Sequence, residues 1–310
     1  WSVAGAQPLS LRYLAAGAAC IAANFGCRPT FALSALLCFP IFWPQITSLL
    51  QGLKSRSLPP RRALRAPAAV IIPALIVVLP LMAYNVARFG SPLDFGNDYQ
   101  MTVTDMTRFV QPTANFLPSV GAYLFLPLRF TSEFPFIGMT PMAFREWGYY
   151  ELMAGGLFAT CPLLLLALAA PFLRRRMHRS GYWGLATCSL ALAVLLAVFD
   201  SHTAGLGWRY ICDFGWMMAI AALAPMLYLM HPGGDAIVAS APDPSERNEP
   251  RRDVTKRHPM VLACVRGLVV AALMASIILA VLACFIPGRD DSLINNNPVL
   301  YDTVVAWFRL

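Results

Sequence analysis

The side chains best suited to chemistry in this chain are charged and polar residues placed beside long apolar runs. One group is the segment GWRYICDF, in which Arg209 and Asp213 are four residues apart and flank Tyr210. On a helix this spacing puts both charges on one face, where they can pair. A guanidinium at a membrane boundary can bind a phosphate through two hydrogen bonds, with Asp213 orienting it. An interfacial arginine that only fixes helix packing is the alternative.

A second group follows a long apolar run, in the segment YNVARFGSPLDFGNDYQ from Tyr84 to Gln100. Gly90 and Pro92 predict the end of a helix there, and polar and aromatic residues continue beyond it. Amides, carboxylates and aromatic rings together suit a sugar or a lipid head group. An ordinary helix exit with aromatic anchoring at the membrane interface is the alternative. The candidate residues are Asn85, Arg88, Asp94, Asp98 and Tyr99.

A third candidate for phosphate binding is Arg28, which precedes Pro29, although an arginine at a helix end in water is a common outcome. His202 lies close to Asp200, but the chain has no HExxH pattern and no Cys/His set with zinc spacing. No P-loop, GxGxxG, GxSxG or DxD motif is present either. We therefore expect no metal, no nucleotide and no other cofactor.

The composition is that of a chain solvated by lipid. Of 310 residues, 58% are hydrophobic and 13% are charged, whereas soluble domains carry about a quarter charged residues. The net charge of +8 does not indicate a nucleic-acid partner, because Lys and Arg cluster in short segments between apolar runs, as in cytoplasmic loops. We expect membrane lipid as a partner and no nucleic acid.

The order of apolar runs and basic segments predicts an all-α polytopic membrane protein with seven transmembrane helices. The amino end is expected inside and the carboxyl end outside, since this arrangement places all three basic loops in the cytoplasm. The predicted spans are residues 12–27, 30–50, 66–87, 152–173, 181–199, 210–230 and 259–287.

The connecting segments have distinct expected roles. Residues 88–151 form a large outer loop, in which the apolar stretch Leu117–Phe130 is too short to span and predicts an interfacial or re-entrant helix. Residues 231–258 are polar and predict a disordered cytoplasmic loop. Residues 288–310 form an outer carboxyl-terminal tail.

Three motifs carry a family resemblance: NFGCRPTFALSALL, YNVARFGSPLDFGNDYQ and GWRYICDF. In this order they resemble the later transmembrane half of bacterial GT-C type glycosyltransferases of the protein-mannosyltransferase-like superfamily. The resemblance extends from Leu11 to Pro225, and each motif is short. The matching positions are Arg28–Pro29, Asn85, Arg88–Phe89–Gly90, Pro92, Arg209–Tyr210 and Asp213.

The resemblance implies an enzyme of the bacterial cytoplasmic membrane that moves a sugar from a polyprenyl-phosphate donor to a glycan, lipid or protein acceptor on the outer face. Arg209 is then the first choice for the phosphate contact and Arg28 the second. An acidic residue in the first outer loop is the base in that family, yet Trp1 to Leu50 contains no acid. We therefore expect the base upstream of this chain and assign no catalytic residue within it.

A protein without enzymatic activity is the alternative. A transporter of lipid-linked glycans, or a subunit of an envelope assembly complex, would share the apolar spans and the interfacial arginines. It would need no carboxylate beside them.

Overall fold

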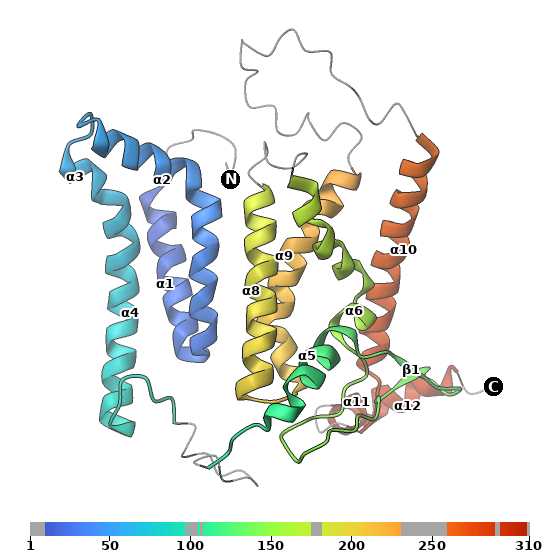
Figure 1. Cartoon of the computed structure of the whole chain (residues 1–310). Coiled ribbons are helices and arrows are strands. Elements are labelled where there is room, and N and C mark those ends of the chain that lie inside the picture. The colour runs from blue at the N-terminus through green and yellow to red at the C-terminus, as the bar shows by residue number, and fades with distance from the viewer. Residues whose placement is uncertain are drawn as a thin grey trace. The chain divides into compact units, whose positions relative to one another are not determined.

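The computed structural model describes residues 10–96, 99, 105, 108–174, 182–230, 259–288 and 292–308 (Figure 1). The chain divides into two compact units, and each is described by itself. The first comprises Trp1–Val110 with Ser180–Cys188, and the second comprises Gln111–Arg179 with Ser189–Leu310.

The first unit begins with two helices that meet at a proline. Helix α1 (Leu11–Cys27) stops where Arg28 adopts an extended conformation, with φ −151°. Pro29 cannot donate a backbone hydrogen bond and so starts a new segment, the 3-10 helix η1 (Pro29–Leu37), which leads into α2 (Cys38–Lys54). The break between the predicted spans 12–27 and 30–50 therefore lies at Arg28–Pro29.

After the short helix α3 (Pro60–Ala63), α4 (Arg65–Phe89) packs along α1. A Cβ atom at Gly26 would lie 3.0 Å from the side chain of Leu81, so the glycine permits this close approach. Helix α4 ends at Gly90, whose φ of 82° is a left-handed conformation suited to glycine.

The second unit is organised around α9 (Ile211–Met230), α10 (Pro259–Ala283) and the part of α8 (Tyr182–Thr203) that follows Cys188. In Figure 1 the carboxyl ends of α8 and α10 lie at the same end of this unit as the amino end of α9. The short helices α5 (Phe116–Phe125), α11 (Leu293–Asn296) and α12 (Pro298–Ala306) lie at that end. It is the end that carries the candidate site.

Among the described residues, five helices are long and apolar enough to cross a membrane, which confirms a helical membrane protein with lipid as its surroundings. The number predicted from the sequence was seven, and seven is not confirmed. Predicted span 12–27 corresponds to α1, which has 17 residues and is shorter than the others. The five candidate spans are Pro29–Lys54, Arg65–Phe89, Tyr182–Thr203, Trp208–Met230 and Ala263–Ala283.

The segment predicted as a span over residues 152–173 is not a continuous α-helix. It folds as α6 (Leu157–Thr160) and the 3-10 helices η4 (Pro162–Ala169) and η5 (Pro171–Leu173). Pro162 and Pro171 break the α-helical hydrogen-bond ladder. The backbone N–H of Leu163 is bonded instead to the hydroxyl of Ser276 on α10, at 3.1 Å. Helices α9 and α10 both pack against η4.

A short helix is found within the predicted stretch Leu117–Phe130: α5 (Phe116–Phe125), which follows the 3-10 turn η3 (Thr113–Asn115). Its interfacial or re-entrant placement stays a prediction. The rest of the predicted stretch departs from helix. It contributes β1 (Arg129–Phe130), which pairs antiparallel with β2 (Ile137–Gly138).

The tail contains two helices, α11 (Leu293–Asn296) and α12 (Pro298–Ala306), close to the hairpin in Figure 1. The predicted disordered loop, residues 231–258, lies outside the described residues.

Candidate functional site

The candidate site is built on two segments of the second unit that run side by side. Tyr150 and Leu206 form a parallel bridge. The Glu151 N–H donates to the Leu206 carbonyl at 2.7 Å, and the Leu206 N–H donates to the Tyr149 carbonyl at 3.0 Å. Alternate residues of an extended segment point to the same side. Tyr149 and Glu151 therefore both face the start of α9.

Tyr123 on α5 fixes the turn between α8 and α9. Its side chain is fully buried, and its ring packs edge-on against Phe214, with centroids 5.5 Å apart. The hydroxyl donates to the Gly205 carbonyl and accepts the Gly207 N–H, both at 2.9 Å. Burial is the main cause that raises the pKa of Tyr123, and the hydrogen bond from Gly207 opposes it. The phenol is neutral and acts as a structural clamp.

Gly205 permits the close approach of the two segments. Its φ is +89°, and a Cβ atom there would lie 2.3 Å from the Tyr149 carbonyl oxygen. Its N–H donates to the Asp200 carbonyl at 3.0 Å, which closes the end of α8. Any residue with a side chain would be strained at this position and would push Tyr149 away.

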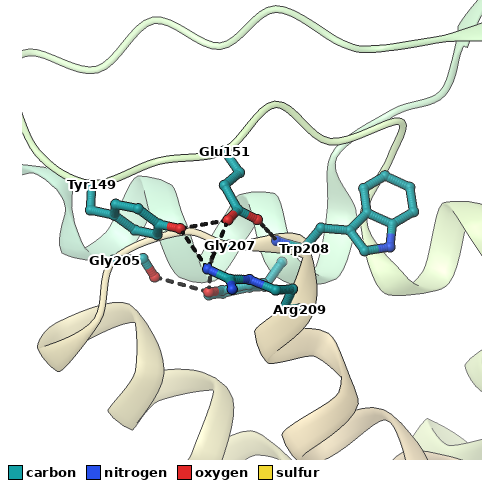
Figure 2. Close-up of polar contacts among 7 residues, drawn as sticks. Tyr149, Glu151, Gly205, Gly207, Trp208 and Arg209 are labelled. Carbon is teal, nitrogen blue, oxygen red and sulfur yellow. Dashed lines mark hydrogen bonds and ion pairs between the residues drawn. The ribbon is translucent and has the colours of Figure 1, made fainter. Parts of the chain in front are cut away.

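The centre of the site is a set of four residues, Tyr149, Glu151, Trp208 and Arg209, which we name the Glu151 cluster (Figure 2). Glu151 Oε1 lies 3.2 Å from Arg209 Nη2 and also accepts a hydrogen bond from the Tyr149 hydroxyl. Glu151 Oε2 accepts the Trp208 N–H at 3.0 Å. Arg209 Nη2 donates to the Tyr149 hydroxyl at 3.1 Å. In Figure 2 the side chains of Tyr149, Glu151 and Arg209 point toward one another, and Trp208 contributes its backbone N–H.

The electrostatics of the cluster favour a fixed arginine. The Glu151 carboxylate caps the amino end of the span that starts at Trp208, where the helix dipole favours negative charge. Burial raises the pKa of Tyr149, its hydrogen bond to Glu151 raises the pKa further, and the hydrogen bond from Arg209 lowers it. The phenol therefore stays neutral between the two charges.

Arg209 keeps donors for a ligand. Its side chain is 63% exposed, whereas that of Glu151 is 31% exposed. Both interactions of the guanidinium with described residues use Nη2. Nη1 and Nε have no bonded partner within the described part of the chain. They can donate to an anion without breaking the cluster.

The predicted pairing of Arg209 with Asp213 is not found. Arg209 lies in the 3-10 turn η7 (Trp208–Tyr210) before α9 begins, so the two side chains do not share a regular helical face. Asp213 is 3% exposed inside the second unit. Within the described residues, Arg209 instead contacts Glu151 and Tyr149. Tyr210 is half-buried beside Gly207.

In the first unit, two of the predicted residues shape the exit from α4. Asn85 is 6% exposed, and its side-chain amide donates to the Pro92 carbonyl at 3.2 Å. Asp94 Oδ1 accepts the Gly96 N–H at 2.8 Å, as in an Asx turn. Both side chains therefore stabilise the turn.

Arg88 and Tyr99 lie on the surface of the same exit. Arg88 donates to the Tyr84 hydroxyl at 2.7 Å, and its guanidinium lies 5.2 Å from the centroid of the Phe89 ring. Tyr99, 64% exposed, stacks on Phe89 with centroids 5.3 Å apart. This exit surface, made of Tyr84, Arg88, Phe89 and Tyr99, combines a cation with aromatic faces.

The predicted residues are distributed over both units. Arg28, half-buried at the start of η1, belongs to the first unit with the exit surface. Arg209, Tyr210 and Asp213 belong to the second. Asp98 lies outside the described residues. The rings of His202 and Phe116 pack nearly perpendicular to each other, with centroids 5.9 Å apart.

Sequence reasoning missed the two residues that hold Arg209. Both Glu151 and Tyr149 lie in the predicted outer loop of residues 88–151, and neither is singled out by a sequence motif. Glu151 is separated from Trp208 by 57 positions, so no local spacing relates them. The available signal was an acidic residue at the start of an apolar run, where charge needs a partner.

No protein-family model, curated protein or solved structure matches this chain. Function is therefore inferred from the residues of the site.

Proposed function

We propose that this chain is part of an integral-membrane glycosyltransferase of the bacterial cytoplasmic membrane. The enzyme takes a sugar from a polyprenyl-phosphate carrier and passes it to an acceptor on the outer face. The observation that carries the proposal is the exposed guanidinium of Arg209, held by Glu151 and Tyr149 at the end of a candidate span.

The position of Arg209 suits the phosphate of a membrane-bound carrier. The prenyl chain of such a donor lies in the hydrocarbon, and its phosphate lies at the boundary with water. The candidate span that contains Arg209 starts one residue before it, at Trp208. An arginine at this depth reaches phosphate without entering the hydrocarbon.

The proposed chemical role is stabilisation of the leaving group. When the bond between sugar and phosphate breaks, the phosphate gains negative charge. A cation that is already fixed in position stabilises this charge without reorganising during the reaction. Glu151 and Tyr149 supply that fixation, and Nη1 and Nε of Arg209 supply the donors.

We assign Glu151 as a positioning residue and not as the base that activates the acceptor. Both of its oxygens already accept hydrogen bonds, from Tyr149, Trp208 and Arg209. Neither oxygen is therefore free to take up an acceptor hydroxyl without giving up one of these partners. The reaction needs a further carboxylate, which we do not assign to a residue of this chain.

The exit surface of the first unit is proposed as a contact for the carbohydrate or for a lipid head group. Its exposed tyrosines, Tyr84 and Tyr99, offer aromatic faces, and Arg88 offers a charge. Arg28 is the second choice for the phosphate contact. These assignments rest on the resemblance and on residue chemistry.

The direct test is substitution of Arg209 in the full-length protein, with transfer from a polyprenyl-phosphate sugar as the readout. Arg209→Ala is expected to lower the rate by about 100- to 1000-fold, the usual cost of losing one donor to a developing anion. The transfer rate of Arg209→Lys is expected to lie between those of the wild type and Arg209→Ala. Arg145→Ala removes another exposed arginine of the second unit and serves as the control. Unchanged transfer in Arg209→Ala would refute the phosphate role.

A second candidate is a non-enzymatic transporter of lipid-linked glycans or a subunit of an envelope assembly. A transporter or assembly subunit needs no carboxylate for proton transfer. The engagement of both Glu151 oxygens in hydrogen bonds is therefore an observation that favours this candidate. This candidate predicts that Arg209→Ala weakens binding of polyprenyl phosphate, while the wild-type protein transfers no sugar.

A further inference from the structure

Helix α12 has two apolar faces, and the described residues of the chain cover only one of them. The inner face carries Val305, which is 8% exposed. At 3.6 residues per turn, Val299, Thr303 and Trp307 recur on the opposite face. Val299 is 76% exposed and Trp307 is 72% exposed. A helix that faced water on this side would be expected to carry charged residues there.

The helix is well defined despite its exposed apolar face. The Asn297 side chain accepts the Leu300 N–H at 3.1 Å and so caps the amino end, and Pro298 occupies the first turn. Just past its carboxyl end, the Phe308 ring stacks on Phe134, with centroids 4.5 Å apart and planes 10° apart.

Aromatic and aliphatic contacts tie this region to the end of α10. Phe134 meets Phe285 with ring centroids 5.2 Å apart. Ile137 and Ile286, each 2% exposed, belong to a buried cluster that also contacts the last turn of α10. We name residues 129–138 and 292–308 together the hairpin–tail module. The module is fixed at the point where α10 ends (Figure 1).

That point is the expected boundary of the hydrocarbon. The candidate span Ala263–Ala283 has 21 residues and is therefore roughly 30 Å long, the thickness of a bilayer core. Phe285 follows two residues later. Aromatic side chains concentrate at this depth in membrane proteins, where an apolar ring can lie beside polar head groups.

We propose that the hairpin–tail module lies in the head-group layer of the membrane and inserts the outer face of α12 among the lipids. Its occupant is the lipid of the same bilayer that the spans cross, because the module continues directly from the end of α10. Phe130, 73% exposed, extends the apolar surface on the hairpin. The exposed Asp302 and Arg129 are compatible with a polar interface.

The module also sets the depth of the Glu151 cluster. Trp208 packs against the buried cluster that contains Ile137 and Ile286. Trp208 directly precedes Arg209 and donates its N–H to Glu151. Seating the module in the head-group layer therefore holds Arg209 at the level of lipid phosphates. The proposal itself does not depend on any transfer reaction.

The test measures the depth of Trp307, one of seven tryptophans, in the full chain. Wild type and Trp307→Phe are placed in phosphatidylcholine nanodiscs whose acyl chains carry bromine either near the head groups or near the bilayer centre. The fluorescence difference between the two proteins isolates Trp307. Strong quenching of this difference by the shallow bromines, with weak quenching by the deep ones and by aqueous iodide, is expected. Quenching by iodide alone would overturn the proposal.

A second measurement separates lipid from a protein partner. A photoreactive benzoylphenylalanine is introduced at position 307 and, as a matched probe on the same face, at position 299. In native membranes both probes are expected to give lipid adducts. Cross-links at both positions to another protein, or to a second copy of this chain, would instead assign the face to a protein interface.

Discussion

The carboxylate of Glu151 accepts the backbone N–H of Trp208 at 3.0 Å, although the two residues are 57 positions apart. A residue of a long loop therefore caps the helix that begins a membrane span. The same carboxylate holds Arg209 through its other oxygen. Stability of the turn and placement of the guanidinium thus depend on one side chain.

Replacing Glu151 by Gln should separate charge from shape. The amide oxygen can still accept the Trp208 N–H, but the ion pair with the exposed Arg209 is lost. We expect a loss of about 0.5–2 kcal/mol in unfolding free energy, measured by thermal unfolding in detergent. Glu133→Gln, at an exposed position of the hairpin, is the control and should change little. Equal effects of both substitutions would contradict a specific role for Glu151.

Tyr123→Phe removes the hydroxyl that bridges Gly205 and Gly207. The Gly205 carbonyl and the Gly207 N–H then stay buried without this hydrogen-bond partner. We expect the free energy of unfolding to fall by about 1–3 kcal/mol. Tyr150→Phe removes a hydroxyl from a side chain that is 43% exposed and is the matched control. Hydrogen exchange of the Gly207 N–H should speed up in Tyr123→Phe alone. Unchanged exchange would show that the bridge is not formed.

Alanine at three glycines should give three different outcomes. Gly205→Ala should be the most destabilising, because the left-handed backbone and the Tyr149 carbonyl both oppose a Cβ atom. Gly90→Ala should lower the free energy of unfolding by about 1–2 kcal/mol, the cost of a left-handed backbone at alanine. No steric clash adds to this cost, since nothing lies within 4 Å of the Cβ position. Gly121→Ala, in helix α5, should stabilise the protein by about 0.5–1 kcal/mol. Thermal unfolding of the three variants gives the ranking.

Alkaline pH should weaken the site through Tyr149. Its pKa in the folded state is raised above the ordinary value of about 10. Its contribution to stability is therefore complete below pH of about 10 and is lost as the pH rises through the folded pKa. Phenolate absorbance, taken as the difference between wild type and Tyr149→Phe, measures this ionisation. Glu151→Gln should shift the Tyr149 titration to lower pH; a shift to higher pH would contradict the proposed hydrogen bond.

The sequence predicted the long helices well, because hydrophobic length alone identifies them. The runs beginning near Ala66 and Gly181 became α4 and α8 with small changes at their ends. The segment after Leu152 did not follow its hydropathy, because Pro162 and Pro171 disrupt the helix and Ser276 supplies a distant partner. Hydropathy cannot report a hydrogen bond from another helix.

The candidate site was only half predictable. Arg209 could be singled out as a charge at the edge of an apolar run. Its pairing with Asp213 was inferred from helical spacing, and that spacing does not apply in the 3-10 turn. Glu151 reaches Arg209 through the bridge between Tyr150 and Leu206, a contact that no local pattern reveals.

The bond between the Leu163 N–H and the Ser276 hydroxyl bears on how the protein is made. The two residues are 113 positions apart, and Ser276 lies within a candidate span. When Leu163 leaves the ribosome, its partner has not yet been synthesised, and an unpaired peptide group costs several kcal/mol in hydrocarbon. We therefore expect the segment around Leu163 to reach its final conformation only after α10 has been inserted. Insertion of this protein would then be completed out of chain order.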